Sequence, residues 1–294
     1  MPKTNLKNYL HLHLLVFIWG FTAVLGALIS VNAIPLVWYR MLVAVIIVFI
    51  YFLITRRNLK IDKKTTLKFI FGGVIIALHW ITFFSAIKVS NVSVALVSMS
   101  TGALFTSLIE PLFFKRKLIL LELLFGLIII GGLYIIFNVE SDFTLGIIYA
   151  LISSFLSALF TVLNGLYIKH HNADTISFYQ LLFGVLFITV YILFTTGFSY
   201  KEFKLTSSDI VYLIILGSIC TAYAFVASVK IMKFLTPYTV MLTVNLEPVY
   251  GIILAVIVFG DKEKMSPQFY IGATIIFITV ILNGILKNKK KSLT

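Results

Sequence analysis

Long apolar runs separated by short polar breaks dominate this chain. Ten runs of about 20 residues or more occur, and about 20 apolar residues let a helix cross a bilayer. They span 9–30, 34–54, 67–87, 92–114, 118–137, 143–168, 175–197, 209–230, 236–259 and 267–286. A transmembrane barrel would instead show segments of about ten alternating residues. We therefore expect an all-α membrane protein with ten spanning helices, because internally hydrogen-bonded helices carry such runs through lipid.

The composition supports this interpretation. Of 294 residues, 60% are hydrophobic and only 12% are charged, which excludes a disordered chain and an ordinary cytosolic enzyme. The one cysteine, Cys220, excludes a disulfide-stapled secreted module. The first run follows Lys3 and Lys7 as in a signal peptide, but it is too long for a typical signal core. We expect it to be retained as the first helix.

The net charge of +13 sets the expected orientation. With a cytoplasmic N-terminus, 18 of the 24 lysines and arginines fall in cytoplasmic loops and five fall outside, while Arg40 lies within a helix. Cytoplasmic loops of membrane proteins carry such an excess of basic residues. We therefore place both termini in the cytoplasm of a cell with a bacterial-type plasma (inner) membrane, and we interpret the basic residues as loop charges, with no nucleic-acid partner.

Weak sequence similarities between the two halves of the chain predict two five-helix repeats, 1–138 and 139–294, within one integral membrane domain. Tyr39-Arg40-Met41-Leu42 matches Tyr179-Gln180-Leu181-Leu182, an offset of 140. An odd number of helices per repeat forces opposite orientations. The purely basic 115–117 loop then corresponds to the mixed 261–263 loop, as a positive-inside bias requires of inverted repeats. Secondary transporters often have such repeats and bind substrate near the midplane between them.

These features resemble a known family. Trp19-Gly20, Arg40 and Asn245-Leu246-Glu247-Pro248 are similar to the drug/metabolite transporter superfamily. The pattern from Pro248 through Phe259-Gly260-Asp261 to Gly272 resembles the EamA-type signature. The resemblance implies efflux of amino acids, related metabolites or drugs, commonly coupled to protons.

Three ionisable residues within the expected spans are the leading site candidates, since such residues mark a pathway or a pair by default. Glu247 precedes Pro248, which cannot donate a helical hydrogen bond, and a carboxylate beside a freed carbonyl suits a cation or a proton. Arg40 suits a substrate carboxylate. A fixed Arg40–Glu247 ion pair is the structural alternative. His79 is a proton shuttle or a neutral helix contact.

Five further residues complete the predicted substrate site. The aromatic Trp19 and Tyr223 lie near the middle of their spans, whereas such residues usually gather at the membrane interfaces. Ser98, Thr101 and Asn245 line a polar cavity or join helices by close packing and hydrogen bonds. Glu110, near a basic loop, is interpreted as an interfacial salt bridge.

We therefore predict a secondary active transporter that exports or exchanges a small metabolite by alternating access, with Glu247 and His79 as proton-coupling candidates. The alternatives are a membrane-embedded enzyme acting on lipid-linked substrates and a non-transporting membrane partner protein. The four histidines near the cytoplasmic surface lack accompanying cysteines or paired acids, so we expect neither a metal nor another cofactor. The expected partners are the substrate and membrane lipids, and a homo-oligomer is compatible with the sequence.

Overall fold

The computed structural model describes residues 3–57 and 59–291, and every regular element in these ranges is helical. The elements up to residue 143 are α1 (Lys3–Leu28), α2 (Ala33–Thr55), α3 (Lys63–Val89), α4 (Val92–Met99), α5 (Gly102–Phe114), α6 (Leu120–Val139) and η1 (Ser141–Phe143). The remaining elements are α7 (Thr144–Tyr167), α8 (Ala173–Phe194), α9 (Tyr200–Phe203), α10 (Ser207–Gly217), η2 (Ser218–Tyr223), α11 (Ala224–Ile231), α12 (Pro237–Val244), α13 (Glu247–Phe259), η3 (Gly260–Glu263) and α14 (Pro267–Lys291).

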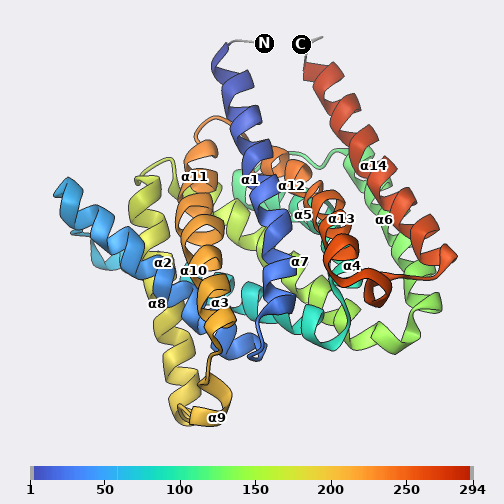
Figure 1. Cartoon of the computed structure of the whole chain (residues 1–294). Coiled ribbons are helices and arrows are strands. Elements are labelled where there is room, and N and C mark those ends of the chain that lie inside the picture. The colour runs from blue at the N-terminus through green and yellow to red at the C-terminus, as the bar shows by residue number, and fades with distance from the viewer. Residues whose placement is uncertain (1–2, 58, 292–294) are drawn as a thin grey trace.

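The lengths and apolar surfaces of these helices define a multi-pass membrane protein. Within the described ranges, eight stretches are helical, long and apolar enough to cross a membrane, and two shorter apolar helices lie within α6 and α14. Large apolar side chains point outward: Ile54 is 76% exposed and Phe194 is 86% exposed. The surface of a water-soluble protein rarely carries so many exposed large apolar side chains. The start of α1 and the end of α14 lie at one end of the bundle, and α9 lies at the other (Figure 1).

Two of the expected continuous spans are interrupted near their middle. The span 92–114 breaks at Ser100–Thr101 between α4 and α5, and the span 236–259 breaks at Asn245–Leu246 between α12 and α13. The second break has a direct cause, because Pro248 lacks an N–H and is tolerated only in the first turn of a helix. Asn245 Nδ2 donates to the Ser100 carbonyl at 2.8 Å, so the two breaks are in contact.

A third expected span, 209–230, contains a π-helical turn, η2, between α10 and α11. The Thr221 hydroxyl donates to the Leu216 carbonyl, five residues earlier, at 2.7 Å. Gly217 permits α2 to approach closely, since a Cβ atom there would lie 2.6 Å from Val43 Cβ and 3.1 Å from the Arg40 carbonyl. The π turn therefore faces α2 at the level of Arg40.

Glycine pairs bring other helices together. A Cβ atom on Gly272 of α14 would lie 2.8 Å from the Gly132 carbonyl of α6, and these two helices run side by side (Figure 1). A Cβ atom on Gly184 of α8 would likewise lie 2.9 Å from the Gly73 carbonyl of α3. Small residues at such contacts allow close backbone approach in membranes, where packing drives association.

Candidate functional site

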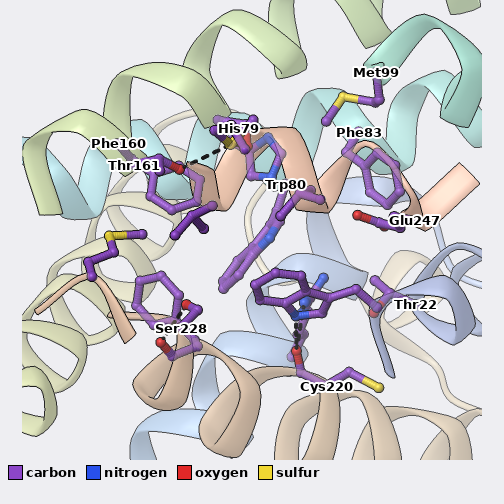
Figure 2. A pocket seen from close by; sticks show the side chains of 18 residues that line it. Thr22, His79, Trp80, Phe83, Met99, Phe160, Thr161, Cys220, Ser228 and Glu247 are labelled. Atoms are coloured by element: carbon purple, nitrogen blue, oxygen red, sulfur yellow. Dashed lines mark hydrogen bonds between the residues drawn. The ribbon is translucent and has the colours of Figure 1, made fainter. Parts of the chain in front are cut away.

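A cavity lies at the centre of the bundle, bounded by α1, α2, α3, α4, α7, the π turn, α11, α12 and α13. Its empty space, with the opening included, is about 700 Å³. Figure 2 shows its mixture of aromatic, sulfur-containing and hydroxyl side chains. It is lined by Trp19, Thr22, Arg40, His79, Trp80, Phe83, Met99, Ser157, Phe160, Thr161, Cys220, Phe225, Ser228, Met232, Val240, Met241, Val244 and Glu247.

Arg40 of α2 supplies a buried cation to this cavity and is only 1% exposed. Its Nε donates to Thr221 Oγ1 at 2.6 Å, and its guanidinium carbon lies 4.1 Å from the centre of the Trp80 ring. Its Nη2 donates to the Cys220 carbonyl at 3.5 Å. The other terminal nitrogen, Nη1, is buried and has no hydrogen-bond partner among the described residues. Buried polar groups are rarely left unpaired, so this nitrogen is a donor available for a bound group.

Glu247 brings a carboxylate to the same cavity from the first position of α13. In the described part of the chain it forms no hydrogen bond and no ion pair within 4.0 Å. Pro248 cannot donate a helical hydrogen bond to the carbonyl of Val244, which also lines the cavity. Arg40 and Glu247 thus share one cavity without the direct contact that a structural ion pair requires.

His79 of α3 reaches the cavity while it is held by α7. Its Nδ1 lies 2.9 Å from the Ser153 carbonyl oxygen, and the Ser153 hydroxyl donates to the His79 carbonyl at 2.8 Å. Because that hydroxyl proton is already used, Nδ1 is assigned as the donor to the Ser153 carbonyl. In the neutral ring the second nitrogen, Nε2, is then an acceptor, and it has no hydrogen-bond partner among the described residues.

Aromatic rings form much of the cavity wall. Trp19 Nε1 donates to the Cys220 carbonyl at 3.2 Å, which ties α1 to the π turn. Trp80 stands near the middle of the site in Figure 2, and its ring centre lies 6.1 Å from that of Phe225. These faces suit an apolar or aromatic body, and they can also attract a cation.

Four of the eight predicted substrate-site residues line the cavity, namely Trp19, Arg40, His79 and Glu247. The other four, Ser98, Thr101, Asn245 and Tyr223, are placed elsewhere. Thr101 Oγ1 donates to the Ser98 carbonyl at 2.9 Å, so these two residues stabilise the break between α4 and α5. Asn245 bridges the two breaks, as described above. Tyr223 is 47% exposed, and its hydroxyl lies 2.9 Å from His11 Nε2.

The predicted substrate site did not include the hydroxyl and sulfur groups of the cavity or its remaining aromatic rings, although Trp80 also lies near the middle of its span. Thr221 is the most consequential of them, because its hydroxyl accepts from Arg40. Thr161 and Ser157 of α7 lie beside the Met241 sulfur, at 3.4 and 4.0 Å. A hydroxyl residue within an apolar run is weak evidence for a binding site, because its hydroxyl usually donates to the carbonyl of the preceding turn of its own helix.

Two further acids join the broken helix α4–α5 to the broken helix α12–α13, one at each end. Glu110 of α5 accepts from the backbone N–H of Tyr238, in the first turn of α12, at 3.1 Å, and it lies 3.6 Å from Arg116. Glu263, after α13, accepts from the backbone N–H groups of Val92 and Ser93 in the first turn of α4, at 3.0 and 2.9 Å. Each broken helix therefore ends in an acid that caps the other. Carboxylates favour such helix N-termini.

Among the described residues, no group of three or more histidine, cysteine or acidic side chains is arranged to hold a metal ion.

Fold and cavity together define a multi-pass helical membrane protein with an ionisable, aromatic-lined binding site. The profile of the EamA-like transporter family matches residues 6–138 and 144–285. The chain therefore belongs to this family, is a membrane transporter, and the resemblance inferred from the sequence is confirmed.

Two relatives carry transporter names, and one solved structure shares the fold. The "Uncharacterized transporter YxxF" of Bacillus subtilis (strain 168) is 22% identical over 80% of this chain and 75% of its own length. An "Uncharacterized transporter" of Archaeoglobus fulgidus is 21% identical over 76% of this chain and 77% of its own length. One solved crystal structure, at 14% identity, shares the fold with a TM-score of 0.68 over 95% of this chain and 96% of that one.

Proposed function

We propose that this protein is a secondary active transporter that exports small amphipathic metabolites, such as amino acids or drugs, across the plasma membrane. The carrying observation is the unpaired Nη1 of Arg40 in a cavity that also holds an unpaired carboxylate, that of Glu247. A substrate with an anionic group for Arg40, a cationic group near Glu247 and an apolar body between the aromatic rings satisfies all three features.

The proposed topology has ten spans in two inverted repeats, 1–138 and 139–294, with both termini cytoplasmic. The similar interruptions of 92–114 and 236–259 support the repeats, because discontinuous helices in corresponding positions often mark a transporter binding site. The excess of basic residues in the loops proposed as cytoplasmic supports the orientation.

Alternating access is the proposed mechanism, and the paired acid caps support it. The caps made by Glu110 and Glu263 lie at opposite ends of the broken helices, and the cavity lies between them. Release of one cap while the other holds would open the cavity to one side at a time. His79 Nε2 and the Glu247 carboxylate are the groups proposed to exchange protons during the cycle.

Counterflow tests this function. Purified protein in vesicles, loaded with one amino acid or amphipathic amine, is expected to take up the same compound in radiolabelled form. Glu247→Gln, which retains size but loses the charge, is expected to insert normally and to abolish this exchange. The control is Glu202→Gln in exposed α9, outside the cavity. Normal exchange by Glu247→Gln removes Glu247 from the mechanism, and no exchange by the wild type with any compound of either class contradicts the proposal.

A further inference from the structure

A second cavity lies beyond the helix ends, where three chain connections meet. It holds about 750 Å³ of empty space, opening included. Its basic side chains are Lys60 from the α2–α3 connection, Lys169, His170 and His171 from the α7–α8 connection, and Lys233 after α11. None of the residues that line it is acidic. We call these five residues the basic pocket.

Contacts between the connections hold the basic pocket together. The Tyr179 hydroxyl of α8 donates to the Leu59 carbonyl, and Arg57 forms an ion pair with Asp174 in the first turn of α8. These contacts join the α2–α3 connection to the start of α8. Lys60 and the 169–171 segment are therefore brought together by defined contacts, and Lys233 lines the same cavity.

Two nearby acids, Asp174 and Asp62, do not line the basic pocket. Asp174 is paired with Arg57, and the Asp62 carboxylate accepts from the Thr65 N–H at 2.9 Å and from its hydroxyl at 2.6 Å. A cluster of lysines without a carboxylate in its lining repels itself, and a bound anion relieves that repulsion.

The pKa of His171 is lowered in part by neighbouring positive charge. Burial lowers the pKa of His171, the neighbouring Lys68 and His170 lower it further, and Asp62 opposes them. An anion bound beside His171 would act in the opposite direction and favour its charged form.

We propose that the basic pocket binds the phosphate group of an anionic ligand, either a free phosphate or the headgroup of an anionic phospholipid. Lysine ammonium groups and histidine N–H groups supply several donors around one site, as a phosphate with its many acceptor oxygens requires. Basic pockets at the cytoplasmic ends of membrane helices suit anionic headgroups. This site is separate from the central cavity, so the proposal stands independently of the transported substrate.

The test compares two matched charge removals in the full-length protein. The double variant Lys169→Gln/Lys233→Gln changes the basic pocket. Lys201→Gln/Lys204→Gln removes the same charge around the exposed α9 at the other end of the bundle (Figure 1). Since Lys169 also contacts the Phe114 ring at 4.5 Å, the single variant Lys233→Gln guards against a folding defect.

Two arms distinguish the sources of phosphate. In neutral detergent, thermal unfolding is followed against inorganic phosphate, with chloride at equal ionic strength as the reference. In the second arm, native mass spectrometry counts the lipids retained from nanodiscs of phosphatidylglycerol or phosphatidylcholine. Wild type and the α9 control are expected to show phosphate-specific stabilisation or selective retention of phosphatidylglycerol. The pocket variants should need at least about tenfold more ligand. Equal behaviour of pocket and control variants in both arms would overturn the proposal.

Discussion

Arg40→Met separates a binding role for Arg40 from a structural one. Methionine fills a similar elongated volume without the charge. After this change the Thr221 hydroxyl still donates to the Leu216 carbonyl, and the Cys220 carbonyl still accepts from Trp19. The substitution therefore leaves neither group without a hydrogen bond.

The expected stability change follows from opposing contributions. The variant loses a charge-assisted hydrogen bond to Thr221, of about 1.5–3 kcal/mol, and a desolvated cation–π contact with Trp80, of about 2 kcal/mol. It gains relief from burying a cation, and that penalty is several kcal/mol for a single ion. The net change in the free energy of unfolding should thus stay within about 2 kcal/mol, whereas breaking a buried ion pair costs about 3–5 kcal/mol.

Thermal unfolding in detergent and counterflow per folded protein give the two readouts. Arg40→Met is expected to unfold near the wild-type temperature and to lose transport of carboxylate substrates. Arg40→Lys retains the charge but not the two-nitrogen fork, and it should raise the KM about tenfold, which corresponds to about 1.4 kcal/mol of lost binding. A strongly destabilised Arg40→Met that transports normally per folded molecule would refute the reasoning.

Three further changes test other contacts. His79→Asn retains a donor for the Ser153 carbonyl but removes Nε2, so stability should persist while the pH dependence of transport is lost; an unchanged pH profile would exclude Nε2. Gly132→Ala should lower the unfolding temperature, because the new Cβ would lie 3.0 Å from a carbonyl of α14. In the control Gly131→Ala the new Cβ meets nothing within 4 Å, and the helix gains about 1 kcal/mol of propensity. Equal effects of the two variants would contradict the packing argument. Asp62 caps the start of α3, and the hydrogen bonds that it accepts from Thr65 lower its pKa. The cap therefore stabilises the fold above the ordinary Asp pKa of about 3.9, and this stabilisation is lost as the pH falls through the folded-state pKa. Acid titration of stability should therefore be shallower in Asp62→Asn, and identical curves would contradict this linkage.

The positions of the helices could be predicted because lipid imposes a simple rule on sequence. Each apolar run had to be helical, and each predicted run contains helix in the structure. The interruptions could not be located in the same way. Pro248 indicates a bend, but the break at Ser100–Thr101 has no proline. It depends on the Thr101 hydroxyl and on Asn245 from another helix, and hydropathy does not report such tertiary contacts.

Those candidate-site residues whose burial in lipid is costly could be predicted from the sequence, whereas those whose burial costs little could not. Arg40, His79 and Glu247 stood out because an ionisable group in lipid needs a reason, and all three line one cavity. Thr221 is indistinguishable in sequence from any hydroxyl that bonds to its own helix. Tyr223, two residues later, lies outside the cavity because the π turn changes the helical register that its sequence position would suggest.

The acids of the broken helices show that the lack of a hydrogen-bond partner, rather than burial, singles out a functional carboxylate. Glu110 and Glu263 are more buried than Glu247, at 5% and 4% exposed. Burial alone would therefore rank them first. Yet Glu110 accepts one backbone N–H and Glu263 accepts two, in each case at the start of the partner helix, and these bonds give a structural reason for burying each carboxylate. The Glu247 carboxylate has no such partner among the described residues, faces the cavity and shares it with an unpaired Arg40 nitrogen. Two of these acids cap helices, whereas the third, within the described part of the chain, faces the cavity without a partner, which favours a ligand or a proton at Glu247.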